Sequence, residues 1–206
     1  MTKIGLRYKT QDDGKLHTSY SELNRCTTPA TTRKAVLERN GITEDFKSEQ
    51  MEFGSIRHKQ WETESLETHR TPKVFEKIYS KSVDYIEQAF AIEIFKDVVL
   101  HFRPDAVSLE DLAVIDYKKI DSSAAKFKSS YQLLIYAYAL AMHDIRVTKR
   151  VFLCEKWNKD NTKILGYERL ELPVNLYDMS MARIWLKPRV KLLKTINDLY
   201  LKGGLV

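Results

Sequence analysis

Two acidic residues and a lysine stand close together in the middle of the chain. The sequence reads Phe-Arg-Pro-Asp-Ala-Val over residues 102–107 and Val-Ile-Asp-Tyr-Lys over residues 114–118, so Asp105 is followed by Asp116 and Lys118. Two carboxylates in such apolar surroundings repel each other and lose hydration unless a cation neutralises them. Mg²⁺ fits this description, because it prefers hard oxygen ligands and is commonly held by one or two carboxylates and by phosphate oxygens. The lysine would then hold or help deprotonate an attacking water, or offset charge that builds on a phosphate.

The register of a β-hairpin decides whether these three side chains meet. Side chains alternate between the two faces of a strand, so Asp116 and Lys118 share a face. If Val107 pairs with Leu112 across a four-residue turn, Asp105 lies on that same face. A shifted register keeps all three side chains on one face only if the numbers of the paired residues still add up to an odd number. The alternative is a surface hairpin on which Asp116 and Lys118 form a weak exposed ion pair.

The elements that must position these residues follow from the spacing of apolar side chains. Helical spacing predicts helices over residues 19–25, 31–39, 52–66, 72–86, 126–142 and 176–201, the last kinked at Pro188. Short β-branched and aromatic runs predict a three-stranded meander over residues 91–95, 98–106 and 112–117, followed by strands over residues 148–155 and 164–172. A helix joins the third strand to the fourth, so we expect an α/β fold with a central mixed β-sheet of about five strands flanked by helices.

Composition limits the class of protein. The chain has 206 residues, a net charge of +6 and 43% hydrophobic residues, which suits a single domain over residues 1–206 with a core at about 19–172 and a C-terminal helix at 176–201. The apolar runs fall short of the ~18 residues of a membrane span, and the first residues lack the apolar core of a secretory signal. We therefore expect a cytoplasmic protein with no membrane partner. The positive charge permits a nucleic-acid partner without demonstrating one.

Several motifs occur in an order that resembles the PD-(D/E)XK nucleases, in particular their RecB-like branch. The matching segments, in chain order, are an opening helix at 19–26, Gly-x-x-x-His at 54–58, the acidic core at 102–107 and 114–118, and Gln-x-x-x-Tyr at 132–136. The resemblance implies a restriction-endonuclease-like fold and a Mg²⁺-dependent DNA nuclease, with Mn²⁺ as a substitute ion. Such an enzyme hydrolyses a phosphodiester by in-line attack of a metal-bound water.

The resemblance also implies roles for individual residues. His58, Asp105 and Asp116 would hold the metal together with Glu93, which corresponds to an acidic position near the RecB-like site. The catalytic set would be Asp105, Asp116, Lys118, His58, Gln132 and Tyr136. Three of the residues named here have a plainer alternative: His58 as a satisfied surface histidine, Tyr136 as a core residue and Glu93 as a solvated strand residue.

Helical spacing supports two of these motifs independently of the family. Gly54, His58 and Glu62 are four residues apart and share one stripe, where the glycine permits close approach and the histidine can face the carboxylates. Gln132 and Tyr136 form a similar pair, able to bind water or a phosphate.

Departures from the family pattern also carry expectations. Phe102 stands where RecB-like proteins often have glycine, and the second acid is aspartate rather than glutamate. Some relatives carry four cysteines for an iron-sulfur cluster, whereas this chain has only Cys26 and Cys154, so we expect no cluster. The Walker phosphate loop is missing, so a helicase or recombination motor would be a separate partner.

Basic and aromatic residues are candidates for DNA contact. The candidates are Tyr20, Arg33, Lys34, Arg103, Lys119, Lys126 and Lys128. The last helix adds four cations, Lys187, Arg189, Lys191 and Lys194, which can equally be its solvated face.

The resemblance to small single-domain relatives favours one activity among several. It implies an exonuclease that acts on DNA ends or single strands in DNA repair, recombination or phage DNA processing, in the cytoplasm of a bacterium or phage-infected host. The alternatives are a structure-selective DNA endonuclease, a catalytically silent DNA-binding or assembly subunit, and an enzyme that acts on RNA.

Overall fold

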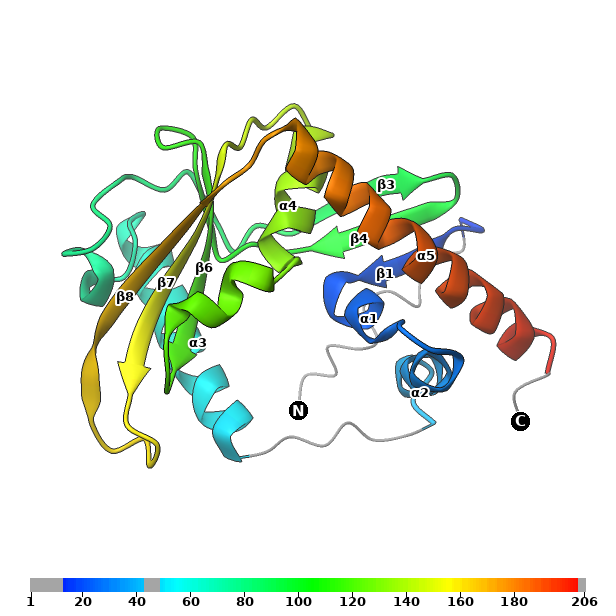
Figure 1. Ribbon diagram of the computed structural model, residues 1–206, viewed down its shortest axis with the longest axis horizontal. Helices are drawn as coiled ribbons and strands as arrows, with labels where there is room; N and C mark the ends of the chain where they lie inside the picture. Colours follow the sequence, from blue (N-terminus) through cyan, green and yellow to red (C-terminus); the bar gives the residue numbers. More distant parts are fainter. Residues whose placement is uncertain (1–12, 43–48, 204–206) are drawn as a thin grey trace. The chain divides into compact units, whose positions relative to one another are not determined.

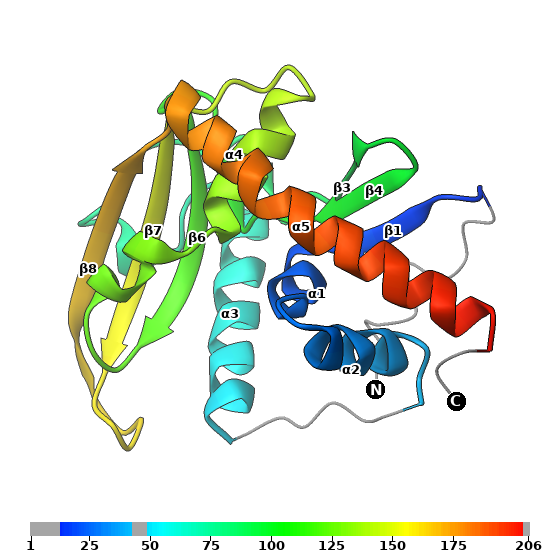
Figure 2. The same ribbon diagram turned by 45° about the vertical axis from the view of Figure 1, so that its right-hand side comes forward.

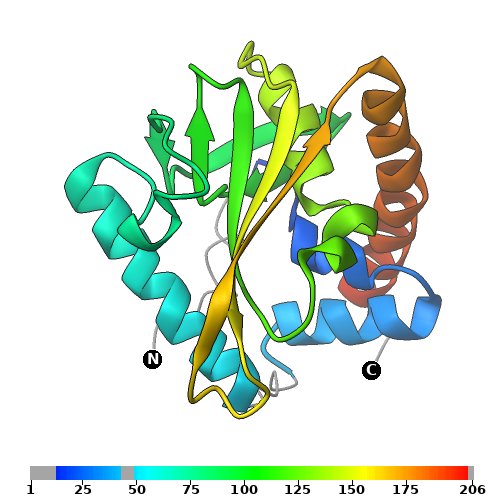
Figure 3. The same ribbon diagram turned by 60° about the vertical axis from the view of Figure 1, so that its left-hand side comes forward.

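Two apolar runs in the second half of the chain build the centre of a five-stranded sheet. The computed structural model describes residues 13–42 and 49–203. The strands of this sheet, in spatial order, are β2 (Tyr85–Ile86), β5 (Ala106–Ser108), β6 (Ala113–Ile120), β7 (Lys149–Trp157) and β8 (Ile164–Pro173). β6 and β7 pair in parallel and the other neighbours are antiparallel, so the mixed sheet of five strands is confirmed (Figure 1). β6 and β7 are the most buried of the long strands, as expected for continuous apolar sequences. The twist of β6, β7 and β8, coloured green, yellow and orange, is visible in Figure 3.

The crossover between β6 and β7 contains one short turn and one helix. The 3₁₀ turn η3 (Ala124–Ser129) precedes α4 (Gln132–Ala141), so the predicted helix over 126–142 is wrong in its first part. Ser130 has extended backbone angles and separates the two. Seven of the ten α4 residues are buried, which explains the nearly unbroken apolar sequence.

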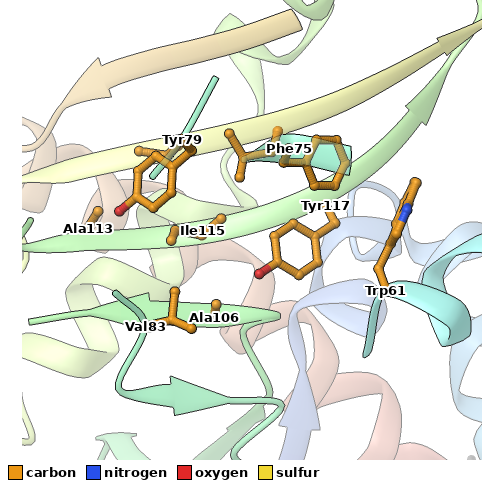
Figure 4. Packing of buried hydrophobic residues seen from close by; sticks show 10 residues of the cluster. Trp61, Phe75, Tyr79, Val83, Ala106, Ala113, Ile115 and Tyr117 are labelled. Atoms are coloured by element: carbon orange, nitrogen blue, oxygen red, sulfur yellow. The ribbon is translucent and has the colours of Figure 1, made fainter. Parts of the chain in front are cut away.

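α3 (Glu49–Thr68) confirms the helix predicted over 52–66, but the helix predicted over 72–86 is wrong. Only η2 (Lys73–Phe75) is helical there, and β2 follows. Phe75, Tyr79 and Val83 repeat every four residues because they pack on the five-stranded sheet (Figure 4). The backbone N–H of Asp84 donates to the carbonyl of Val107 at 2.8 Å instead of to a helical partner.

A separate three-stranded sheet has the order β1 (Leu16–Ser19), β4 (Val98–Phe102) and β3 (Phe90–Phe95). β1, which the sequence analysis did not predict, pairs in parallel with β4. The single strand predicted over 98–106 is therefore wrong, since its two halves belong to different sheets. Pro104 lies at the break and has no N–H to continue a ladder.

Three predicted helices are confirmed: α1 (Tyr20–Arg25), α2 (Pro29–Arg39) and α5 (Leu176–Leu201). Ser19 accepts the N–H of Glu22 at the start of α1, and Thr28 forms a capping box with Thr31 at the start of α2. Pro188 lies within the continuous α5. Tyr20 stacks on Trp185 at 5.5 Å and thereby joins α1 to α5. The ribbons of these two helices lie side by side in Figure 2.

The described residues divide into two compact units, while the predicted single domain stays a prediction. Residues 13–42, 90–102 and 180–203 form the three-stranded unit, and residues 49–89 and 103–179 form the five-stranded unit. No helix in the described part of the chain is both long and apolar enough to cross a bilayer.

Candidate active site

The hairpin of β5 and β6 brings the two predicted aspartates together. Val107 pairs with Val114 rather than with Leu112, which lies in the turn at a φ of 51°. The predicted register is thus wrong by two residues, but the sum of the paired numbers stays odd. The same-face argument survives, because the observed register continues to Asp105 opposite Asp116.

Asp116 is buried and its partner Lys118 is only 28% exposed, so the alternative of a weak exposed ion pair on a surface hairpin is wrong. The Asp116 side chain is only 2% exposed, and the Lys118 ammonium lies 2.9 Å from its Oδ1 and 2.8 Å from its Oδ2. Gln132 Nε2 donates to the same Oδ1 at 3.3 Å and lies 3.4 Å from the hydroxyl of Tyr136. α4 therefore places both residues of the Gln-x-x-x-Tyr motif beside the second acid.

Asp105 lies at the centre of a second group of side chains. Its Oδ2 accepts the backbone N–H of Tyr117 at 2.6 Å, and its Oδ1 is 3.6 Å from Nε2 of His58. The same His58 nitrogen is 3.2 Å from Oε1 of Glu87. Ligand atoms of these three ionisable residues lie within 4.8 Å of one another. We call His58, Glu87, Asp105 and Asp116 the acidic cluster.

The pKa values in the acidic cluster reflect carboxylates that crowd one another. Burial, reinforced by the charge of Asp116, raises the pKa of Asp105 to about 7. The hydrogen bond to Glu87 raises the pKa of His58 to about 9, against the effect of burial. Burial also acts to lower the pKa of Lys118, but Asp116 and Asp105 outweigh it and raise that pKa above its usual value. The cluster therefore holds positive charge strongly, as a cation site must.

The donor atoms of the acidic cluster fit a divalent cation. Among the described residues, Asp116 Oδ2 is a buried carboxylate oxygen that receives no hydrogen bond, although the Lys118 ammonium is close to it. Three carboxylates and one imidazole offer the hard oxygen ligands, plus one nitrogen, that suit Mg²⁺ or Mn²⁺. Such an ion would compensate the negative charge that the cluster buries.

Glu87 is the member of the acidic cluster that the sequence analysis missed. It follows β2, and its backbone N–H donates to the carbonyl of Asp105 at 3.1 Å. Its φ of 49° is uncommon for a residue other than glycine and recurs at functional sites. No periodic pattern marks this position; the only available signal was an acid between two short apolar runs.

Glu93, the acid predicted instead, lies elsewhere. It is on β3 in the three-stranded unit, where it pairs with Lys15 and accepts the backbone N–H of Asp97 at 3.1 Å. The structure does not bring it into the acidic cluster, because the strand break at Pro104 assigns β3 and β6 to different sheets.

Two arginines support the cluster rather than extend it. Arg103 Nε forms an ion pair with Oε2 of Glu87 at 2.9 Å, and its contact with DNA stays a prediction. Arg57, next to His58 on α3, forms a two-point ion pair with the fully buried Glu155 at 2.6 and 2.9 Å. The indole N–H of Trp157 donates to the same carboxylate at 2.6 Å. This bond network ties α3 to β7 and thereby fixes the position of His58.

A cavity of about 670 Å³ adjoins the acidic cluster between α3 and the end of β6. Its lining includes Gly54, His58, Lys118, Lys119 and Lys126. A Cβ atom built on Gly54 would meet no atom within 4 Å, so the glycine is not needed for packing inside the protein. Its absent side chain instead leaves the cavity wall open.

The other predicted DNA contacts are spread over both units. Lys119 lies over the ring of Phe53, and Lys126 is 3.5 Å from Asp121. Lys128 is in η3 of the five-stranded unit, whereas Tyr20, Arg33 and Lys34 are in α1 and α2 of the three-stranded unit. Their contact with DNA stays a prediction.

Comparison with known proteins agrees with this arrangement. The family model of the PD-(D/E)XK nuclease superfamily matches residues 14–183, and the chain belongs to this superfamily. No curated protein sequence matches the chain.

Several solved structures share the fold at low sequence identity. LHK-Exo, an alkaline exonuclease from Laribacter hongkongensis solved in complex with dAMP, is 12% identical over 93% of this chain and 94% of its own, with a TM-score of 0.56. A putative exonuclease from Eubacterium rectale is 15% identical over 93% and 85%, with a TM-score of 0.59. A phage-related exonuclease from Haemophilus somnus 129PT is 12% identical over 92% and 96%, with a TM-score of 0.58. The restriction-endonuclease-like core expected from the motifs is thus confirmed.

Proposed function

We propose that this superfamily member is a Mg²⁺-dependent deoxyribonuclease, and that it acts as an exonuclease on DNA ends or single strands. The observation that carries the proposal is the buried pair of Asp116 and Lys118 beside Asp105, His58 and Glu87. The similar structures named as exonucleases support the mode of action. DNA repair, recombination or phage DNA processing in a bacterial cytoplasm, with any motor as a separate partner, belongs to the same proposal.

The acidic cluster would hold the metal ion. Asp105 and Asp116 offer oxygens from adjacent strands, Glu87 adds a third carboxylate and His58 a nitrogen. A bound divalent cation supplies Lewis-acid stabilisation for charge that develops on the phosphate. His58 lies next to Oε1 of Glu87, and Arg103 binds the other oxygen, Oε2. Arg103 thereby keeps the Glu87 carboxylate in place.

Lys118 is placed to act at the reacting phosphate, because its ammonium lies 2.8 Å from Oδ2 of Asp116 and it lines the cavity beside the acidic cluster. It would orient the attacking water and offset negative charge on the phosphate. Gln132 holds Oδ1 of Asp116 by its Nε2, and Tyr136 lies next to that amide, so this pair fixes the carboxylate or contacts the phosphate.

A Mg²⁺ titration with end-labelled DNA tests the proposal. The substrates are single- and double-stranded, linear and covalently closed circular, and the parent is compared with Asp116→Asn and Lys118→Ala. We expect Mg²⁺-dependent loss of linear DNA that both substitutions abolish, and the label released first reports the polarity. Cleavage of closed circles would replace the exonuclease with an endonuclease. Binding without cleavage in both Mg²⁺ and Mn²⁺ would indicate a silent DNA-binding subunit, and preferential cleavage of RNA would change the substrate.

A further inference from the structure

One face of α5 carries a regular row of lysines. Lys187, Lys191 and Lys194 are four and three residues apart, so they fall on one stripe of the helix. The turn between β3 and β4 contributes Lys96, and all four lysines line the same cavity of about 300 Å³ in the three-stranded unit. We call this cavity the lysine hollow.

The charge in the lysine hollow is largely uncompensated. Asp198 is the one acid among the residues that line it. Within the described ranges, none of the four lysines has a carboxylate within ion-pair distance, whereas Lys149 and Lys156 of β7 are each paired with an acid. Like charges so close together create a positive potential that attracts an anionic partner.

The hollow rests on a rigid apolar base. Val98 and Val190 are buried and Phe95 is half-buried, and they belong to a strand and a helix rather than to a loop. Apolar surroundings suit the aliphatic stems of lysines, whose charged ends stay in water. The row of charges is thus held at a constant spacing.

We propose that the lysine hollow binds the sugar-phosphate backbone of DNA, apart from the acidic cluster that cleaves it. The inference rests on the proposed function in taking DNA as the substrate. At ~1.5 Å of rise per residue, Lys187 to Lys194 extend over about 10 Å of helix, or roughly three phosphates of one strand at ~3.4 Å each. A row of this length matches a polyanion better than a single phosphate ion. Lysines contact phosphates as point charges, and contacts to phosphates carry no direct sequence information, so the hollow would hold DNA independently of sequence.

The salt dependence of DNA binding tests this proposal. Binding of fluorescently labelled duplex DNA is measured by anisotropy in Ca²⁺ over a series of KCl concentrations, for the parent and for Lys187→Ala/Lys191→Ala. Each lost phosphate contact lowers the slope of log K against log[KCl] by about 0.9, so two should lower it by about 1.8. The loss of affinity between about 50 and 200 mM KCl then becomes roughly 12-fold smaller than in the parent. In Mg²⁺, we expect Lys187→Ala/Lys191→Ala to have a higher KM for DNA than the parent and the same kcat.

A matched pair of lysines controls for the loss of charge. Lys73 and Lys77 are exposed, four residues apart and in the five-stranded unit. Lys73→Ala/Lys77→Ala removes the same charge and should leave slope and KM unchanged. Equal slopes for the parent and Lys187→Ala/Lys191→Ala, or equal losses in both double variants, would overturn the proposal.

Further measurements distinguish DNA binding at the lysine hollow from the proposed nuclease activity and from the binding of other anions. Asp116→Asn should lose cleavage but keep the parent slope. If the parent protein binds no DNA, both proposals are overturned. If the parent cleaves DNA but Lys187→Ala/Lys191→Ala leaves the salt dependence of DNA binding unchanged, only the lysine-hollow proposal is overturned. Inorganic phosphate at matched ionic strength should displace DNA no better than chloride. Stronger displacement, or tighter binding of RNA of the same sequence, would overturn the choice of DNA backbone.

Discussion

The two units each place a carboxylate and a lysine together on a sheet, with opposite consequences. In the three-stranded unit, Lys15 and Glu93 are 35% and 41% exposed, and the hydrogen bond from Lys15 lowers the pKa of Glu93. In the five-stranded unit, Lys118 is 28% exposed but its partner Asp116 is only 2% exposed and lies beside Asp105, whose pKa burial raises to about 7. Lys15 and the backbone N–H of Asp97 satisfy the exposed carboxylate of Glu93, whereas the carboxylates of the acidic cluster are buried close to one another. The same residue types therefore make a surface ion pair in one unit and a candidate metal site in the other.

The largest expected effect is on cleavage. Asp116→Asn and Lys118→Ala should each lower the rate of DNA hydrolysis by about 10²–10³-fold, because the first removes a carboxylate that would hold the metal ion and the second removes the cation that would offset charge on the phosphate. Single-turnover cleavage of end-labelled DNA in Mg²⁺ measures this. Lys156→Ala is the control: Lys156 pairs with Glu168 at 3.1 Å on the same sheet but outside the acidic cluster. A similar loss in all three variants would mean that general damage to the sheet, rather than the buried pair, explains the effect.

The next effect concerns stability in the five-stranded unit. Arg57→Ala removes the ion pair from the buried Glu155 carboxylate and leaves it the hydrogen bond from the Trp157 indole, so it should lower the free energy of unfolding by about 3–5 kcal/mol. Urea unfolding followed by tryptophan fluorescence measures it. A cost below about 1 kcal/mol would show that water reaches Glu155 and that burial does not distinguish this ion pair from surface pairs.

A smaller effect, on metal binding, distinguishes Glu87 from Glu93 as the third carboxylate ligand. Glu87→Gln should weaken Mn²⁺ binding, measured by calorimetry, and raise the Mg²⁺ concentration for half-maximal cleavage by about 10–100-fold. Glu93→Gln should change neither quantity, because Glu93 pairs with Lys15 in the other unit. The opposite result would restore Glu93 as the ligand expected from the motif.

The smallest effect is expected for the exposed pair itself. Lys15→Ala should leave the urea midpoint unchanged within error, since water and salt screen exposed ion pairs. A clear loss of stability that grows at low salt would show that this pair matters as much as the buried one.

Local periodicity explains which parts of the fold were predictable. The strands over 148–155 and 164–172 and the helix over 52–66 were predicted because their apolar patterns extend over many residues. The helix over 72–86 was predicted wrongly, because its spacing of four reflects contact with the sheet, and its last part, from Asp84 to Ile86, pairs with β5. Tertiary contacts there override a local helical pattern.

In the candidate site, too, local periodicity predicts some features and tertiary contacts decide the others. The shared face of Asp116 and Lys118 depends only on the two-residue period of a strand, and the placement of Asp105 on that face survived a register error because the error was an even number of residues. Glu87 could not be found in this way. Its place depends on an uncommon backbone angle and on a bond to the carbonyl of Asp105.

The sequence by itself thus determined the arrangements that repeat along one element: the two residues of β6 that form the buried pair, and Gln132 with Tyr136 one turn apart on α4. Only the tertiary structure decided that His58 and Glu87, 29 residues apart, converge on Asp105, and that Glu93 does not. Backbone geometry sets distances within an element, whereas the meeting of distant elements depends on how their apolar faces pack.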